Sequence, residues 1–378
     1  MYSNIVLTGG KSILGKFNLL GKFIEDNNIE HVKNLKSEDV EKWIEKVKVA
    51  FQNSKSDPKK VSVEYSLVHT LKEMNKLANN PDISIIHTNT KEGIISAKLN
   101  EYIFRKDFNA NVILKGVDFD INDRIKLNKQ YGEFMDILVT ELQKGNIYNT
   151  FFSPTPGYKV MSYLGYVAGS FYGYKMGYLY EEGSVFQEVP PIPIKFDIEE
   201  SIDYLYLIKE IQESEIKYNS LSKMEQEFID NHTYFFDTID GVVVLNAFGL
   251  FLFKNILTTE IFISDELKEM WDKLDNDKRK FVKTQIFELI RKIKLFKSNN
   301  NSYKGELMHN KSWEGKRFNK PYLYKSITGN IFRAVWDTDE NKLNLYYIWL
   351  DHDKYEREYE KIMQKYQDYK CKNLLELI

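Results

Sequence analysis

Two short segments combine glycine, a hydroxyl side chain and a lysine in a pattern that suits phosphate binding. Residues 8–12 read Thr-Gly-Gly-Lys-Ser and residues 153–159 read Ser-Pro-Thr-Pro-Gly-Tyr-Lys, and each follows a short apolar run and precedes helical spacing. A strand, a tight turn and a helix leave unpaired N–H groups at the helix start, where the helix dipole also favours negative charge. We therefore predict that a phosphate-bearing ligand binds at these turns.

The C-terminal part of the chain concentrates positive charge. Residues 264–378 hold 24 Lys and Arg against 19 Asp and Glu, a net charge of +5, which leaves −7 for the first 263 residues of a chain whose total is −2. Residues 311–333 hold six basic residues and one Glu. Aromatic residues lie between them: Trp313, Phe318, Tyr322, Tyr324 and Phe332. Cations interleaved with rings are typical of a polyphosphate track with stacking platforms, although composition alone fits a solvated sheet edge equally well.

Composition excludes several classes of protein. The chain of 378 residues is 43% hydrophobic and 29% charged, as in ordinary globular proteins. Its longest apolar run, residues 242–253, is interrupted by Asn246 and Gly249 and is too short to cross a bilayer, so we expect a cytoplasmic protein with no membrane partner. The single cysteine, Cys371, excludes an internal disulfide or a Cys-rich zinc site, and the six histidines are scattered. We expect no metal and no cofactor.

The two turns require a scaffold, and the pattern of the first 190 or so residues supplies one. Strands are predicted at residues 3–7, 83–88, 112–117 and 150–153, and helices at residues 61–77, 91–104 and 122–144. Alternating strands and helices favour a parallel α/β sheet, whose ligands bind at the carboxyl ends of the strands. Both turns should then lie at one edge of one sheet. Residues 29–51 are predicted to be helical, and to cover the protein's own core or dock a protein partner.

The chain is predicted to form three domains. Residues 1–197 form the α/β domain. Residues 198–263 read as two helices, a strand and an apolar helix, which suits a winged-helix-like spacer whose acidic, aromatic character favours packing over DNA binding. Residues 264–378 read as two basic helices, a set of strands with a hairpin and a last helix, a compact α+β domain.

Three features of the N-terminal part resemble a known family. They are Leu-Thr-Gly-Gly-Lys-Ser at residues 7–12, Thr-Pro-Gly-Tyr-Lys at residues 155–159, and the trailing Tyr-Glu-Glu and Pro-Pro-Ile-Pro at residues 180–182 and 190–193. On these, about the first 195 residues resemble a CARF domain of the APE-type CRISPR-associated proteins. The second turn departs from the family's Thr-Gly-Gly-x-Lys pattern, because Pro156 replaces the first glycine and removes one N–H.

The resemblance implies a Rossmann-like homodimer that binds a cyclic oligoadenylate on its two-fold axis, and we favour cyclic tetra-adenylate. Lys11 and Lys159 would neutralise phosphates, and backbone amides of the turns, including those of Gly9 and Gly10, would donate to the ligand. The implied ligand-binding residues are Thr8, Gly9, Gly10, Lys11 and Ser12 in the first turn, and Thr155, Pro156, Gly157, Tyr158 and Lys159 in the second.

The C-terminal part resembles the RelE-type toxins, which are small ribosome-dependent mRNA endonucleases. The carrying features are the basic helical pair, residues 324–333 on a hairpin strand, and His-Asp-Lys-Tyr-Glu-Arg-Glu-Tyr at residues 352–359. Together the two parts resemble the CARF and RelE fusion proteins of type III CRISPR systems. The resemblance implies a ring-activated mRNA interferase of antiviral defence, with the ribosome and mRNA as partners.

Such an enzyme needs no metal. The 2′-hydroxyl of the mRNA attacks its own phosphodiester, so the protein must orient the backbone, stabilise the developing charge and move protons. The predicted catalytic residues are Arg333 for the phosphate, Lys325, Arg317 and Lys320 as supporting cations, His352 as general acid or base, and Tyr355 or Tyr359 as a platform for a base. His352 is chosen because an unperturbed imidazole titrates near neutral pH.

Two alternative functions stay open. Glu314-Gly-Lys316 fits the end of a metal-dependent PD-(D/E)xK nuclease motif, although residues 298–313 offer no aspartate; and the middle segment could serve a ligand-sensing transcription regulator, although it is acidic. Other classes fit poorly. A HEPN ribonuclease needs an arginine followed by a histidine with four to six residues between them, and no arginine of this chain has that spacing. A Walker A loop needs glycine where the chain has Ile5, and the chain also lacks the G-x-G-x-x-G motif of dinucleotide-binding proteins.

Overall fold

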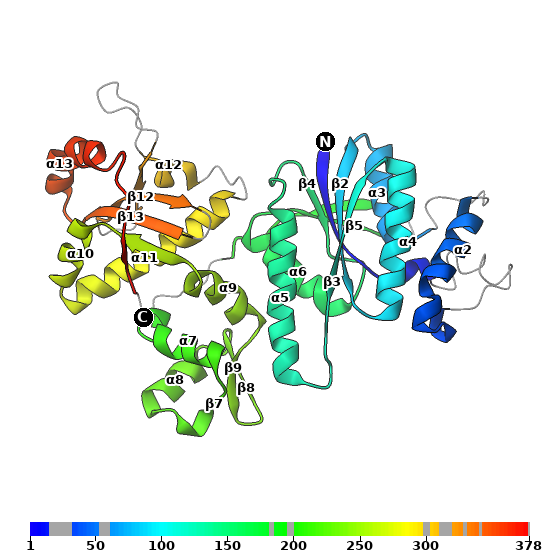
Figure 1. Ribbon diagram of the computed structural model, residues 1–378, viewed down its shortest axis with the longest axis horizontal. Coiled ribbons are helices and arrows are strands. Elements are labelled where there is room, and N and C mark those ends of the chain that lie inside the picture. The colour runs from blue at the N-terminus through cyan, green and yellow to red at the C-terminus, as the bar shows by residue number, and fades with distance from the viewer. Residues whose placement is uncertain are drawn as a thin grey trace. The chain divides into compact units, whose positions relative to one another are not determined.

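The chain folds into two compact units, Met1–Lys195 and Phe196–Ile378, shown in the computed structural model of Figure 1. The division lies close to the predicted boundary after residue 197. The structure describes residues 1–14, 32–52, 61–180, 185–194, 200–297, 303–309, 320–327, 331–339 and 342–376.

A six-stranded sheet with the order β3-β2-β1-β4-β5-β6 forms the centre of the N-terminal unit. Its strands are β1 (Tyr2–Thr8), β2 (Leu77–Thr88), β3 (Asn111–Val117), β4 (Thr150–Ser153), β5 (Met176–Leu179) and β6 (Phe186–Val189). The first five strands run parallel, and β6 is antiparallel to β5. The predicted parallel α/β sheet is therefore confirmed.

Helices cover both faces of this sheet. They are α2 (Val40–Gln52), α3 (Val63–Glu73), α4 (Lys91–Phe108), α5 (Arg124–Leu142) and α6 (Lys159–Phe171), with 3-10 turns η1 (Ser12–Leu14), η2 (Val32–Asn34) and η3 (Ser37–Asp39). Figure 1 shows α3 and α4 on one side of the sheet and α5 and α6 on the other. Trp43, Ile44 and Val47 of α2 are buried in the same core as α3 and α4, so this helix covers the protein's own core.

The chain reverses its direction of travel across the sheet at β1. From β1 it proceeds to β2 and β3 on one side, and then crosses back to place β4 on the other side. Leu7 of β1 lies opposite Ser153 of β4, so the turns that follow these strands are neighbours. The prediction that both turns share one sheet edge is confirmed, and this edge is where open α/β sheets bind ligands.

The C-terminal unit begins with a small helical and antiparallel section. It contains η5 (Glu200–Ile202), α7 (Leu205–Glu213), β7 (Ile216–Lys217), η6 (Tyr218–Ser220), α8 (Lys223–Asn231), β8 (Phe236–Ile239), β9 (Val242–Leu245) and α9 (Ala247–Leu257). The three strands pair in the order β7-β9-β8. Asp240 and Gly241 join β8 to β9 with φ of +51° and +79°, the conformation of a tight hairpin turn.

A five-stranded sheet with the order β11-β12-β13-β10-β14 completes this unit. Its elements are β10 (Glu260–Ile263), α10 (Asp265–Asp272), α11 (Asn276–Lys297), α12 (Lys304–Leu307), β11 (Tyr322–Lys325), β12 (Arg333–Asp339), β13 (Lys342–Trp349), α13 (His352–Lys365) and β14 (Asn373–Leu374). Strand β10 pairs parallel with β13, so this sheet includes residues that precede the predicted boundary at 263/264. Within the residues that the structure describes, no helix has the length and apolar character needed to span a bilayer.

Candidate functional site

A cavity of about 590 Å³ opens at the edge where β1, β2 and β3 end. Gly9, Gly10 and Lys11 line it from the turn after β1, and Gly157 and Tyr158 line it from the turn after β4. The loops after β2 and β3 contribute the rest of the wall. The structure therefore gathers residues of both predicted turns around one cavity.

The two turns touch each other through their backbones. The Thr8 hydroxyl donates a hydrogen bond to the Pro156 carbonyl. A methyl group added at Gly10 would lie 2.8 Å from the Gly157 nitrogen, and one added at Gly157 would lie 2.9 Å from the Gly9 oxygen. Gly157 also has a φ of +108°, which other residues rarely adopt. Glycine at these positions is what lets the two turns meet.

The hydrogen-bond donors of the turn after β1 are paired with acceptors inside the protein. The Gly9 N–H donates to the Ile86 carbonyl at 2.6 Å, and the Gly10 N–H donates to Glu64 Oε1 at 2.5 Å. The Ser12 hydroxyl donates to Glu64 Oε2 at 2.8 Å. The Gly9 and Gly10 amides, predicted to contact the ligand, already have acceptors on β2 and α3 that the local sequence does not reveal, so the structure leaves neither of them unpaired.

Glu64, at the start of α3, is fully buried. Burial raises the pKa of its carboxyl, and hydrogen bonds from neutral donors, the Gly10 amide and the Ser12 hydroxyl among them, act in the opposite direction. The residue was not predicted, since no motif near it marks a site.

The turn after β4 leaves its donors near the cavity. Helix α6 begins at Lys159, and the side chain of its N-cap residue, Tyr158, makes no capping hydrogen bond. Gly157, Tyr158 and Lys159 are all exposed. Pro156 has no N–H, and the Met161 N–H donates to the Tyr158 carbonyl at 2.8 Å, so the donors left at this helix start are the amides before Met161. This turn matches the predicted anion site better than the turn after β1.

The two predicted lysines differ in their surroundings. The Lys11 side chain is 60% exposed, and its Nζ lies 3.8 Å from Glu92 Oε1 in the first turn of α4. Lys159 is exposed and forms no ion pair within the described part of the chain. An anionic ligand must therefore compete with Glu92 for Lys11, whereas no carboxylate of the described part of the chain competes with it for Lys159.

An aromatic pair supplies a possible base platform. Tyr158 is 48% exposed, and its ring stacks on Phe119 with the centroids 6.0 Å apart and the planes at 26°. Both residues line the cavity. Phe119 was not predicted, although its position just after the third strand of a parallel sheet was a usable signal. Exposed stacked rings bind nucleobases without much sequence preference.

The C-terminal unit brings four predicted catalytic residues together. Lys325 of β11 lies opposite Arg333 of β12. The Arg333 guanidinium lies 5.7 Å from the centroid of the Tyr355 ring, and the His352 ring lies 6.1 Å from the same ring. Lys320 is exposed just before β11, and Arg317 lies outside the described residues.

Arg333 is the most unusual member of this cluster. It is 7% exposed, and burial lowers the pKa of its guanidinium. Its Nη1 donates to the Phe332 carbonyl at 3.0 Å, whereas its Nε has no hydrogen-bond partner in the described part of the chain. His352 is 52% exposed, with Nε2 lying 3.7 Å from Glu356 Oε1. A buried cation with an unused donor can accept an anionic partner.

Tyr355 and Tyr359 do not fit the role predicted for them. They are 5% and 3% exposed and belong to a core cluster with Trp349 and Tyr347 between β13 and α13. Burial raises the pKa of both phenols. Neither ring can stack on a base while this core is intact, so that prediction is wrong. The helical spacing of the two tyrosines marks the buried face of α13.

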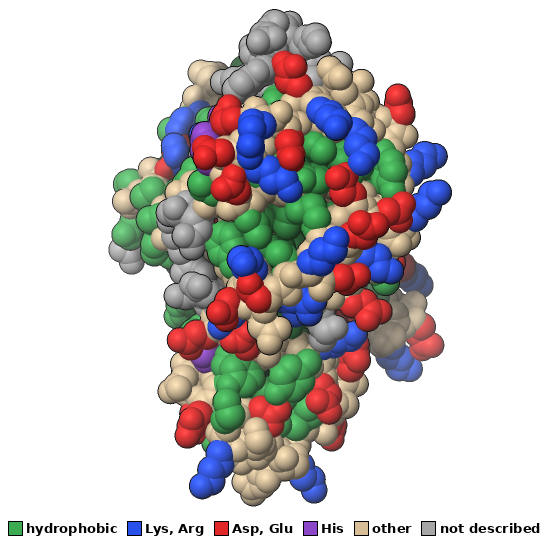
Figure 2. Space-filling view, turned by 90° about the vertical axis from the view of Figure 1, so that its left-hand side faces the viewer, with side chains coloured by type: hydrophobic (Ala, Val, Ile, Leu, Met, Phe, Trp, Pro, Cys, Tyr) green, Lys and Arg blue, Asp and Glu red, His purple; other side chains and the backbone are tan. Residues whose placement is uncertain are grey.

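The surface of the molecule adds one constraint. Figure 2 shows a face on which Lys and Arg side chains alternate with Asp and Glu around areas of hydrophobic side chains. The coloured Lys and Arg side chains do not form one continuous patch on this face. Among the described residues, no group of three or more His, Cys, Asp or Glu is arranged to hold a metal ion.

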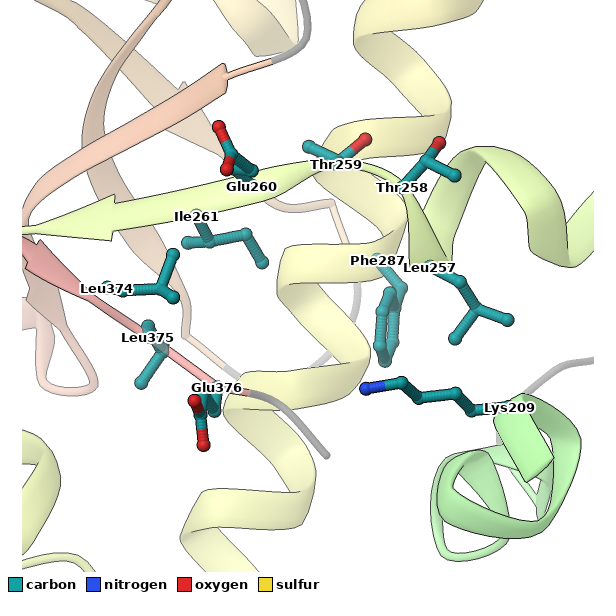
Figure 3. A pocket seen from close by; sticks show the side chains of 10 residues that line it. All are labelled: Lys209, Leu257, Thr258, Thr259, Glu260, Ile261, Phe287, Leu374, Leu375 and Glu376. Atoms are coloured by element: carbon teal, nitrogen blue, oxygen red, sulfur yellow. The ribbon is translucent and has the colours of Figure 1, made fainter. Parts of the chain in front are cut away.

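A second cavity, of about 300 Å³, lies in the C-terminal unit (Figure 3). Leu257, Ile261 and Phe287 give it apolar walls, and in Figure 3 the Lys209 amine is turned toward Phe287. None of the residues predicted from the sequence lines it.

The geometry of the N-terminal unit agrees with its similarity to known proteins. Residues 59–192 match the family described as CRISPR-associated protein (Cas_APE2256). The match includes Glu64, Phe119 and the turn after β4. It starts after the β1 turn and ends before the C-terminal unit. No curated protein matches the chain.

Proposed function

We propose that the N-terminal unit binds a cyclic oligoadenylate at the cavity between the two turns. The observation that carries this proposal is that one cavity is lined by Lys11 and by the stacked Tyr158–Phe119 pair, and that α6 begins with Lys159 directly after this lining. A ring of adenylates presents phosphates and bases together, which need cations and aromatic platforms together. The match to CRISPR-associated proteins supports the same ligand class.

We further propose that two copies of the chain hold one ring. Helix α6, which starts at the cavity, turns apolar residues outward: Tyr163 is 71% exposed, and Val160, Tyr166 and Val167 are partly exposed. A ring with an even number of nucleotides has two-fold symmetry, so two copies of one turn can each bind half of it. Sedimentation of the full chain with and without cyclic tetra-adenylate tests this arrangement, and a monomer in both conditions contradicts it.

For the C-terminal unit we propose metal-independent cleavage of ribosome-bound mRNA in the manner of RelE-type toxins. The order of two helices, antiparallel strands and a last helix supports this reading, as does the cluster of Arg333, Lys325 and His352. The 2′-oxygen attacks the phosphorus and the 5′-oxygen leaves, so the products are a 2′,3′-cyclic phosphate and a 5′-hydroxyl. Arg333 binds the phosphate, and His352 transfers a proton.

Ring binding is proposed to activate cleavage by a population shift, in which the ring binds the active arrangement of the protein more tightly. The decisive experiment incubates the full chain with translating ribosomes and cyclic tetra- or hexa-adenylate, with and without EDTA. The proposal expects mRNA cleavage that requires the ring and survives EDTA. Metal-dependent cutting of naked nucleic acid favours the PD-(D/E)xK alternative, whose Glu314 and Lys316 lie outside the described residues; duplex binding without cutting favours a regulator.

The role of Arg333 is tested by Arg333→Ala. Loss of a cation that stabilises transition-state charge lowers cleavage by about 10²- to 10³-fold, while ring affinity stays unchanged. Arg357→Ala is the matched control, because Arg357 is an exposed arginine of α13. Since Arg333 is buried, the melting temperature must be measured alongside, and Arg333→Lys keeps the charge. Normal turnover by a folded Arg333→Ala protein refutes the assignment.

A further inference from the structure

Glu64 lies directly beneath the turn that lines the ligand cavity. Its two carboxylate oxygens accept the Gly10 N–H at 2.5 Å and the Ser12 hydroxyl at 2.8 Å, and the Val63 N–H donates to the same hydroxyl at 3.0 Å. These donors are all neutral. The cation of this turn, Lys11, instead has its Nζ 3.8 Å from Glu92.

This arrangement is electrostatically costly when a polyanion enters the cavity. Buried carboxylates normally pair with a cation, since removal from water disfavours the charged form. Gly10 itself lines the cavity, so a phosphate there would lie on the other side of the turn from the carboxylate. Two negative charges separated by a turn repel each other strongly where water is excluded. A proton on Glu64 removes that repulsion.

We propose that Glu64 is a positioning residue that fixes the β1 turn and takes up a proton when the phosphate-bearing ligand binds. The inference rests on the proposed function of the N-terminal unit. Protonation preserves the geometry: Oε1 still accepts the Gly10 N–H, while Oε2 takes a proton from solution and donates it to the Ser12 oxygen, whose own hydrogen rotates away from the carboxyl group. The turn therefore keeps its shape while its underlying charge disappears.

Other titratable groups lie in or beside the walls of the same cavity and must be distinguished from Glu64. Lys11 in the turn and Asp118 after β3 line it, and Glu92 on α4, Lys159 on α6 and His87 at the end of β2 are sequence neighbours of lining residues. His87 is 6% exposed, and burial lowers the pKa of its imidazole. It could also bind a proton, so His87→Gln belongs in the experiment as a second control.

The direction in which ligand affinity changes with pH follows from the negative charge of ionised Glu64. A ligand that favours protonated Glu64 binds more weakly as pH rises, by up to about tenfold per pH unit between the pKa values of the free and bound states. Glu64→Gln imitates the protonated form, because its amide accepts from Gly10 and donates to Ser12. Its ligand affinity should not change with pH.

The test is titration calorimetry of the full chain with cyclic tetra-adenylate, in buffers of different ionisation enthalpy between about pH 6 and pH 8. Wild type should take up protons on binding, and Glu64→Gln should take up none, with a flat affinity profile. The matched control is Glu141→Gln, which changes another buried carboxylate of the same unit, on α5 with the Ser84 hydroxyl 2.5 Å away. It should behave as wild type.

Each outcome bears on the inference. Equal proton uptake by wild type and Glu64→Gln, or none by either, overturns it while leaving ring binding intact. Uptake abolished by His87→Gln alone assigns the proton elsewhere and overturns it too. A wild type that binds no ring overturns the proposed function and this inference together. Glu64→Ala, which removes both hydrogen bonds, should lower the melting temperature and the affinity, and Glu64→Gln should restore both.

Discussion

The two glycine turns of the N-terminal unit were predicted alike to bind phosphate, but the structure gives them different surroundings. The turn at residues 8–12 has two glycines, a lysine and a serine, and the turn at residues 155–159 lacks one N–H because of Pro156. In the structure the first turn gives its donors to Ile86 and Glu64. The second opens an uncapped helix start and an exposed lysine toward solvent.

This contrast teaches that a glycine-rich turn binds anions only when the fold leaves its N–H groups unpaired. Every buried N–H finds some partner, and a strand or a carboxylate from elsewhere in the chain serves as well as a phosphate. We therefore propose that the β1 turn serves as the scaffold and that the β4 turn contacts the ligand. Three substitutions test this difference between the two turns.

Lys159→Ala should have the largest effect on affinity. Lys159 is a cation at a helix N-terminus with no competing carboxylate, so its loss should weaken binding of the nucleotide ring by about 1.5 to 3 kcal/mol, roughly ten- to 150-fold. Calorimetric titration with cyclic tetra-adenylate measures it. Lys159→Arg, which keeps the charge, should retain most of the affinity. If Lys159→Ala binds the ring as tightly as wild type does, the role proposed for the β4 turn is contradicted.

Gly157→Ala should come next, because it strains the meeting point of the two turns. A side chain at φ of +108° costs about 1 to 3 kcal/mol, and the added methyl group would lie 2.9 Å from the Gly9 oxygen. We expect a lower melting temperature and weaker ring binding. Gly305→Ala is the control, since an added methyl group there meets nothing within 4 Å. An unchanged melting temperature for Gly157→Ala would show that the contact between the turns is unimportant.

Lys11→Ala should have the smallest effect, less than about 1 kcal/mol, because an exposed charge that already has a partner gains little from a second one. Glu92→Gln should do the opposite and tighten ring binding, since it frees Lys11 for the phosphate. The two variants are compared in the same titration. If Lys11→Ala loses more affinity than Lys159→Ala, the roles assigned to the turns must be reversed.

In the C-terminal unit, too, the structure agrees with the sequence for some predicted side chains and differs for others. Arg333 and Lys325 could be paired from the sequence, because a hairpin strand and its neighbour place them opposite each other. Tyr355 and Tyr359 lie four residues apart and continue to Ile362 and Met363 along one apolar face of a charged helix, so their burial could have been predicted from the sequence. The segment around Arg317 lies outside the described residues, so the prediction for that residue stays a prediction.

The sequence by itself determined the alternation of strands and helices, the two turns and their place at one edge of a parallel sheet. These follow from local spacing and from the rule that parallel strands end at the same side. Only the tertiary structure decided which turn keeps its donors, that Glu64 lies under the other, and that Phe119 joins Tyr158. Those outcomes depend on which distant groups satisfy a buried N–H or a ring face, and local sequence does not carry that information.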